Sequence, residues 1–224
     1  MWRELIKMWK SHNLLDESWN QSSEMLEITY RMFTEAIDAF RSGKYQELEK
    51  KVHNQDKIVN SYQREVRRKV LTHCSLQGPQ ELPGGLVLVS IIIDIERIGD
   101  YTKNIVDLAT YRTTKLNAGI FSKDLDKIEE SVKDYFMQTK TYIKTCDAEA
   151  ALELFNKYEW IGKQCDHCLI DLVHEKDKTI SLGDSATLAL YFRQLKRINA
   201  HLRNITTSIV NPFDRIGFKP KTKK

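Results

Sequence analysis

The sequence has few residues that interrupt helices and few that cross-link a chain: 9 glycines, 4 prolines and 4 cysteines among 224 residues. The prolines stand at positions 79, 83, 212 and 220, which leaves two long stretches without any. Because proline is excluded from helix interiors, such stretches favour helices. The composition excludes a collagen, a low-complexity chain and a disulfide-dense mini-protein.

Long hydrophobic runs are also missing. The longest runs from Leu86 to Ile93 and is interrupted by Ser90, whereas a membrane-spanning helix needs roughly 20 apolar residues. The N-terminal stretch places charges among its apolar residues and offers no small-residue cleavage site, so no secretory signal is predicted. Together with the unevenly spaced cysteines, this predicts a protein of the reducing cytoplasm.

A strong excess of one charge is absent as well, because 35 Lys and Arg stand against 31 Asp and Glu, for a net charge of +4. A chain that grips a nucleic-acid backbone usually carries a basic stripe, whereas here the two signs mostly alternate. The exceptions are Arg64, Arg67, Arg68 and Lys69, and the tail lysines 219, 221, 223 and 224. We interpret both as solvated surface and predict no nucleic-acid partner.

What is present is helical periodicity. Apolar residues recur in steps of three and four over 26–40 and 188–209, and over 91–105 with one polar member. The breaks between such patterns predict six long helices at about 4–42, 45–75, 85–115, 121–146, 148–179 and 184–210. The predicted fold is all-α, with two tandem antiparallel three-helix bundles over 1–117 and 118–210 and a basic tail over 211–224.

An internal repeat supports this division. Residues 97–105 read Arg-Ile-Gly-Asp-Tyr-Thr-Lys-Asn-Ile, and residues 197–205 read Arg-Ile-Asn-Ala-His-Leu-Arg-Asn-Ile. The Arg-Ile and Asn-Ile pairs recur at an offset of 100 residues. Repetition at such a distance indicates two copies of one structural unit, so the third and sixth helices are predicted to be equivalent.

Acidic residues on two neighbouring helices form the most informative pattern. Glu96, Asp100 and Asn104 follow one another at four-residue spacing and therefore share one helix face, on a stripe that begins with apolar residues. Asp56 and Glu49 occupy the inward edge of the preceding helix. Carboxylates on facing helices are a common way to bind iron, zinc or manganese. The alternative is a solvated face on which Arg97 or Lys103 neutralises the acids.

The segment Glu96-Arg-Ile-Gly-Asp100, followed by Asn104-Ile, resembles the signature of the PhoU family of phosphate-signalling proteins. The stretch Asp56-Lys-Ile-Val-Asn60 is similar to the motif on that family's preceding helix. Together with the two-copy layout, the resemblance extends over the chain to about residue 210.

The resemblance implies a regulator and not an enzyme: a cytoplasmic, homodimeric helical protein that damps phosphate uptake by acting on a phosphate transporter, a membrane sensor kinase or both. It also implies iron or zinc, in clusters of one or more ions. Carried over to this chain, the metal ligands of the first repeat are Glu96, Asp100 and Asp56, with Asn104, Asn60 or Glu49 nearby.

The second repeat departs from this pattern, because Lys196 and Ala200 stand where the two acidic residues belong. An ammonium group can supply the positive charge that a metal would otherwise bring. We therefore predict that the second site is lost, and that Lys196 pairs with Asp166 or Glu159.

Other interpretations of the sequence remain open. A metal-free helical adaptor with the same fold is the main alternative, and a metal-dependent phosphohydrolase is a weaker one. Cys165 and Cys168 have the spacing of a thiol metal site, although lone pairs of cysteines more often pack as small hydrophobic residues. The amphipathic N-terminal helix, with Trp2 and Trp9 opposite basic residues, either packs on a partner or lies on a membrane surface.

Overall fold

The computed structural model describes residues 14–43, 46–112 and 114–220. Within these ranges the regular structure is entirely helical, which confirms the all-α fold class. The predicted N-terminal amphipathic segment lies outside the described residues. None of the described helices is long and apolar enough to cross a membrane. The α-helices are α2 (Leu14–Ser42), α3 (Gln46–Gln77), α4 (Leu82–Thr110), α5 (Ser122–Thr145), α6 (Ala148–Lys157), α7 (Trp160–Val173) and α8 (Leu182–Val210).

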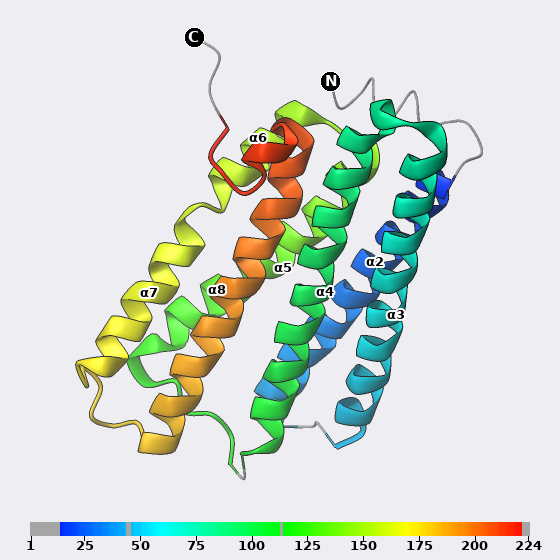
Figure 1. Cartoon of the computed structure of the whole chain (residues 1–224). Helices are drawn as coiled ribbons and strands as arrows, with labels where there is room; N and C mark the ends of the chain where they lie inside the picture. The colour runs from blue at the N-terminus through cyan, green and yellow to red at the C-terminus, as the bar shows by residue number, and fades with distance from the viewer. Residues whose placement is uncertain (1–13, 44–45, 113, 221–224) are drawn as a thin grey trace.

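The helices pack in two groups around one continuous hydrophobic core. Helices α2, α3 and α4 pack against one another, and α8 packs against α5, α6 and α7. The long helices α4 and α8 lie side by side at the centre and join the groups (Figure 1). Helix α3 lies at one edge of the molecule, so one of its sides faces outward.

The contact between α4 and α8 contains a buried polar link. The Oδ1 atom of Asp94 on α4 lies 2.7 Å from Nδ1 of His201 and accepts a hydrogen bond of 2.8 Å from Asn204, both on α8. The ring of His201 also stacks on Tyr101 of α4, with 5.6 Å between ring centroids. These contacts fix the register of the two central helices.

Helix α4 begins at Leu82, three residues before the predicted start at about residue 85, and includes Gly84 and Gly85. A Cβ atom at Gly85 would lie 2.7 Å from Sγ of Cys74 and 2.9 Å from Cγ1 of Val70, both on α3. Glycine therefore allows the close approach of α3 and α4. The helix also ends earlier than predicted, at Thr110.

The predicted helix over 148–179 is wrong, because the chain forms α6 and α7 with a break at Tyr158 and Glu159, and α7 ends at Val173. Tyr158 is buried, stacks on Tyr135 with 4.8 Å between centroids, and donates a hydrogen bond to Asp134 on α5. These tertiary contacts lie at the break. The residues at the break include no proline or glycine that would predict it from the sequence.

Asp184, at the start of α8, ties down the linker between the two groups of helices. Its carboxylate accepts hydrogen bonds from Ser181 (2.7 Å), from the backbone N–H of Asn117 (3.1 Å) and from Arg112 (2.6 Å). Burial raises the pKa of this carboxyl, but the hydrogen bonds outweigh burial and lower it on balance.

Asp184→Ala is expected to lower the free energy of unfolding by about 2 kcal/mol at pH 7, because it leaves several donors without their charged acceptor. A lowered pKa stabilises the fold above the ordinary value of 3.8 and loses that contribution as the pH falls through the folded-state value. Urea denaturation should therefore show a smaller difference from wild type in acid. The exposed Asp214→Ala is the matched control, and an equal effect of both variants would contradict the assignment.

Candidate functional site

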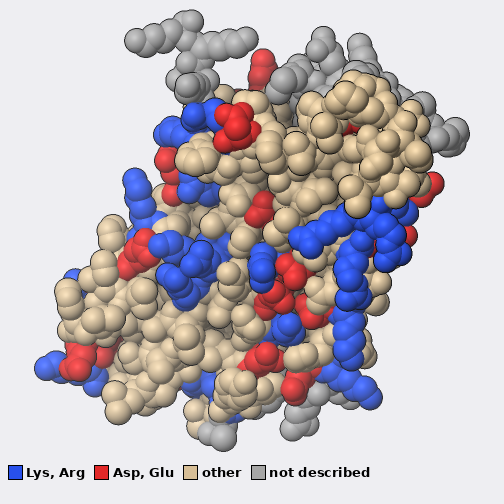
Figure 2. All heavy atoms as spheres, viewed as in Figure 1, with Lys and Arg blue, Asp and Glu red and all other residues tan. Residues whose placement is uncertain are grey.

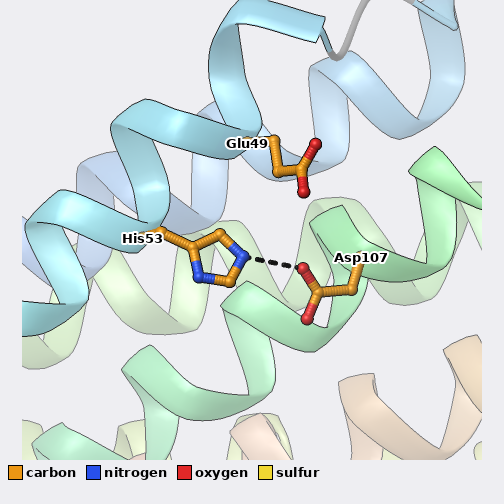
Figure 3. Close-up of side chains that lie close together, drawn as sticks. All are labelled: Glu49, His53 and Asp107. Carbon is orange, nitrogen blue, oxygen red and sulfur yellow. Dashed lines mark hydrogen bonds and ion pairs between the residues drawn. The ribbon is translucent and has the colours of Figure 1, made fainter.

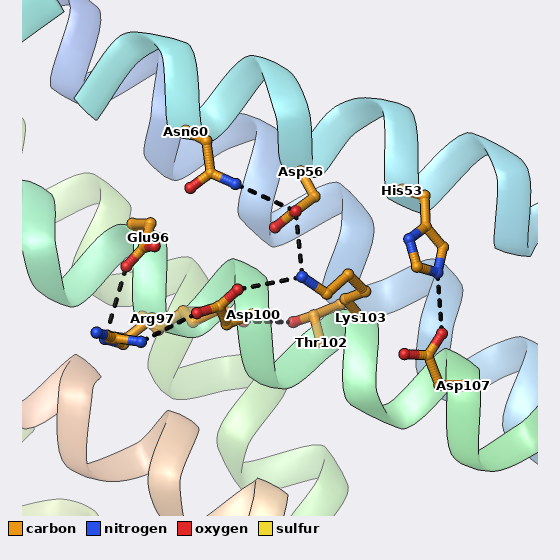
Figure 4. Close-up of polar contacts among 10 residues, drawn as sticks. His53, Asp56, Asn60, Glu96, Arg97, Asp100, Thr102, Lys103 and Asp107 are labelled. Carbon is orange, nitrogen blue, oxygen red and sulfur yellow. Dashed lines mark hydrogen bonds and ion pairs between the residues drawn. The ribbon is translucent and has the colours of Figure 1, made fainter. Parts of the chain in front are cut away.

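The predicted acidic residues line the contact between α3 and α4, and a lysine lies between two of them. Nζ of Lys103 is 3.2 Å from Oδ2 of Asp56 and 3.2 Å from Oδ1 of Asp100 (Figure 4). Asn60 donates a hydrogen bond of 3.2 Å to Asp56, one helical turn away. Burial alone would lower the pKa of Lys103, but its hydrogen bonds to the two carboxylates raise it on balance. The ammonium therefore stays charged at neutral pH.

Glu96 stands apart from this arrangement. Its Oε2 atom lies 3.7 Å from Nε of Arg97. Nη1 of the same arginine donates a hydrogen bond of 3.2 Å to Asp100. Burial, together with the negative charge of Asp100, raises the pKa of Glu96. These contacts agree with the alternative interpretation of the sequence, in which Arg97 or Lys103 neutralises the acids.

The acidic stripe of α4 lies at the edge of the core and not within it. The core-facing residues of this helix include Ile91, Ile95, Ile98, Thr102 and Ile105, which are fully buried. Glu96, Asp100 and Asn104 are only half-buried, as are the apolar residues that begin their stripe. The acidic stripe is therefore offset from the face of α4 that packs into the core.

As they lie, Glu96, Asp100 and Asp56 do not fit a metal ion. The position between the two aspartates is taken by a cation of the chain itself, Lys103. One observation points the other way: Oδ1 of Asp56 is buried without a hydrogen-bond partner, close to Gly99. A single unpaired oxygen is far short of the several donors that iron or zinc needs.

A second group of donors lies farther along the same two helices. Glu49 and His53 are four residues apart on α3, and Asp107 faces them from α4 (Figure 3). Ligand atoms of the three side chains all lie within 4.8 Å of one another, and Nε2 of His53 is 2.9 Å from Oδ1 of Asp107. In the described part of the chain, this is the one group of three or more His, Cys, Asp or Glu donors close enough to hold a metal.

Only Glu49 of this group was among the predicted ligands. The four-residue spacing of Glu49 and His53 is a signal that the sequence contains, since it places both on one helix face. Asp107 had no such signal, because its place beside them depends on the register of α3 against α4. One imidazole and two carboxylates form a donor set suited to zinc, with room left for water or another ligand.

In the second repeat, the predicted pairing of Lys196 is confirmed for one of its two proposed partners. Nζ of Lys196 lies 2.5 Å and 2.7 Å from the two carboxylate oxygens of Asp166 on α7. Glu159 instead pairs with Lys219, at 3.3 Å. Ala200 is exposed on α8. Both repeats thus have a lysine beside the acidic residues of their motif.

Reversing the charge of Lys196 to glutamate should destabilise the fold by about 0.5 to 1 kcal/mol, a small but measurable loss, because exposed ion pairs contribute little. The side chains of Lys196 and Asp166 are 34% and 45% exposed. The shift in the urea midpoint should shrink at high salt, where repulsion is screened. Lys178→Glu, at an exposed position, is the control, and an unchanged midpoint for Lys196→Glu would count against the pairing.

The two cysteines of the predicted thiol site are both buried on α7. Burial raises the pKa of Cys165 to about 12 and that of Cys168 to about 11, so both remain protonated at neutral pH. Among the described residues, neither belongs to a group of three metal donors. These observations favour the interpretation in which both pack as small hydrophobic residues.

Comparison with known proteins identifies the fold and a domain in the first half of the chain. Residues 22–109 match the PhoU domain family. The chain is similar to the crystal structure of the phosphate transport system regulatory protein PhoU from Streptococcus pneumoniae, with a TM-score of 0.76 and 16% identity over 88% of this chain and 93% of that one. It is also similar to PhoU from Pseudomonas aeruginosa, with a TM-score of 0.78 and 18% identity over 88% and 95%. No curated protein sequence matches it.

Proposed function

We propose, from the premise that this chain belongs to the PhoU family, that it regulates phosphate uptake by contact with a phosphate transporter, a membrane sensor kinase or both. The observation that carries the proposal is the PhoU domain over residues 22–109, which contains the predicted signature. The fold, shared with PhoU proteins over 88% of the chain, supports it. The proposed action is binding and not turnover, and it takes place in the cytoplasm. We also propose that the protein is a homodimer, and sedimentation equilibrium tests this directly.

The charged contacts between α3 and α4 suit a protein that acts as a rigid binding partner. Lys103 joins two carboxylates on neighbouring helices, so the function at this position is to hold α3 against α4. We propose that the signature acids work without a metal ion here, as in the metal-free adaptor interpretation. Iron or zinc, where the protein takes it up, is assigned to Glu49, His53 and Asp107, where it would cross-link the same two helices.

Measuring phosphate uptake tests the function. Cells that lack this protein should take up labelled phosphate faster in phosphate-rich medium than cells that contain it. Restoring the chain should lower the rate again. Uptake that is the same with and without the protein would contradict the proposal.

Metal content tests the assignment of the ligands. Protein purified without a tag or chelator and then exposed to zinc should lose bound zinc in His53→Ala with Asp107→Asn. The matched control is Glu96→Gln with Asp100→Asn, which alters two acids of the cluster predicted from the sequence. This control should bind zinc as wild type does. Loss of zinc in the control alone would place the metal at the signature instead.

A further inference from the structure

We propose that the outward face of α3 binds an anionic membrane surface. Helix α3 packs mainly against α2, α4 and the short turn Pro79–Glu81, all on its inner side. Its outward arc includes nine exposed residues: Lys50, Asn54, Lys57, Ser61, Arg64, Arg68, Leu71, Thr72 and Ser75. We call this arc the basic face.

The charge on the basic face has one sign. It carries four cations and no acidic residue, although α3 itself contains acids elsewhere. Lys50, Lys57 and Arg64 are spaced by seven residues and therefore lie nearly one above another. With a rise of about 1.5 Å per residue, the cations from Lys50 to Arg68 extend over roughly 27 Å. A column of basic side chains runs along α3 in Figure 2.

These cations differ from the other lysines of the helix in having no ion pair with any residue that the structure describes. Lys51 pairs with Glu35 at 2.6 Å, and Lys69 pairs with Glu17 and Glu65 at 3.2 Å and 3.1 Å. Those contacts serve the fold. The charge of Arg68 lowers the pKa of Glu65 without forming an ion pair, and the charges of Lys50, Lys57 and Arg64 remain available to a partner.

The shape of the basic face favours a broad, flat anionic surface. The other polar residues of the basic face, Asn54, Ser61, Thr72 and Ser75, are short, so the long basic side chains protrude. Leu71, 69% exposed at one end of the face, offers an apolar side chain that can enter the interface between headgroups and acyl chains. Basic residues near an anionic leaflet attract it without needing a defined pocket.

A membrane-binding face would bring the regulator to the membrane in which its proposed partners reside, and in that respect the inference rests on the proposed function. The two can fail separately. Vesicle binding needs neither a transporter nor a kinase, so vesicles test the face alone. Unchanged phosphate uptake in a chain that still binds vesicles would count against the proposed function only.

The test is co-sedimentation of the full chain with phosphatidylcholine vesicles that contain about 30% phosphatidylglycerol, at low salt. The wild type should bind these vesicles, and not pure phosphatidylcholine vesicles, and its affinity should fall as salt rises. Replacing Lys50, Lys57, Arg64 and Arg68 together with glutamine should weaken binding more than tenfold while the circular dichroism spectrum stays unchanged.

The matched control removes the same charge elsewhere. Lys123, Lys144, Lys163 and Lys178 are exposed on the second half of the chain, and their replacement by glutamine gives the same net charge. This control should bind vesicles nearly as wild type does. Equal weakening of both variants would overturn the proposal, because net charge and not the basic face would then be responsible. Failure of the wild type to bind anionic vesicles would also overturn it and would direct attention to an acidic protein surface.

Discussion

Arg41→Met is expected to lower the free energy of unfolding by about 3 kcal/mol at pH 7, because it leaves the buried carboxylate of Glu129 without its cationic partner. Glu129 on α5 is only 6% exposed. It accepts hydrogen bonds of 3.1 Å and 2.9 Å from Nε of Arg41 on α2, and a further one from the hydroxyl group of Tyr191 on α8. The variant keeps an apolar stem but removes the charge that compensates burial, at a point where both groups of helices meet.

The cost of this substitution should depend on pH. Burial raises the pKa of Glu129 above its ordinary value of 4.5, although Arg41 and Tyr191 oppose the rise. Without Arg41 the pKa rises further. A carboxyl with a raised pKa binds its proton more readily in the folded state, so its contribution to stability is present below the unfolded pKa and is lost as the pH rises through the folded value. The deficit should therefore be largest at neutral pH and smaller near pH 5.

Urea denaturation at pH 7 and at pH 5 measures this difference. Lys176→Met is the control, because the pair of Lys176 with Asp171 is largely exposed and should contribute well under 1 kcal/mol at either pH. A deficit for Arg41→Met that is equal at both pH values would show that lost apolar contacts, and not the stranded charge of Glu129, cause the destabilisation.

Lys103→Ala is expected to cost about 2 kcal/mol in metal-free buffer and to recover much of that loss when zinc or manganese is added. Asp56 is buried and Asp100 half-buried, so without Lys103 the charge of Asp56 loses its cation and that of Asp100 retains only Arg97. A divalent ion could then take the position of the ammonium, and binding to the folded state alone would stabilise it.

Thermal unfolding with chelator and with added metal tests this expectation. Lys57→Ala, which removes an exposed lysine from the same pair of helices, should unfold as wild type does in both conditions. If metal stabilises Lys103→Ala no more than it stabilises Lys57→Ala, the two aspartates are not a latent metal site. If Lys103→Ala is not destabilised in chelator, the lysine does not compensate their charge.

The helices could be predicted from sequence because their signals are local. The apolar steps from Leu188 to Ile209 follow the buried face of α8, and Ser181 caps that helix where a break was predicted. The break at Tyr158 could not be predicted, since it accompanies contacts with residues of α5. Local patterns carry no information about such partners.

The candidate site also depends on contacts between helices, which local sequence patterns do not reveal. Of the predicted acids, Asp100 lies close to Asp56 and Glu96 stands apart, and spacing allowed either a metal or Lys103 as the source of positive charge. The choice depends on where the lysine side chain lies between two helices, which spacing does not determine. His53 and Asp107 were missed because they are 54 residues apart in the chain and meet only through the register of α3 and α4.

The stacking of Tyr101 on His201 has a consequence for the origin of the fold. The two residues are separated by the 100-residue offset of the internal repeat, so each is the counterpart of the other. A position that meets its own counterpart lies on a two-fold axis, the mark of an isologous interface between identical units. The packing of Tyr101 on His201 between α4 and α8 is thus the contact expected if the internal repeat reflects two copies of one unit. Asp94 breaks that symmetry, because position 194 is a glutamine, and its bonds to His201 and Asn204 exist in one direction only.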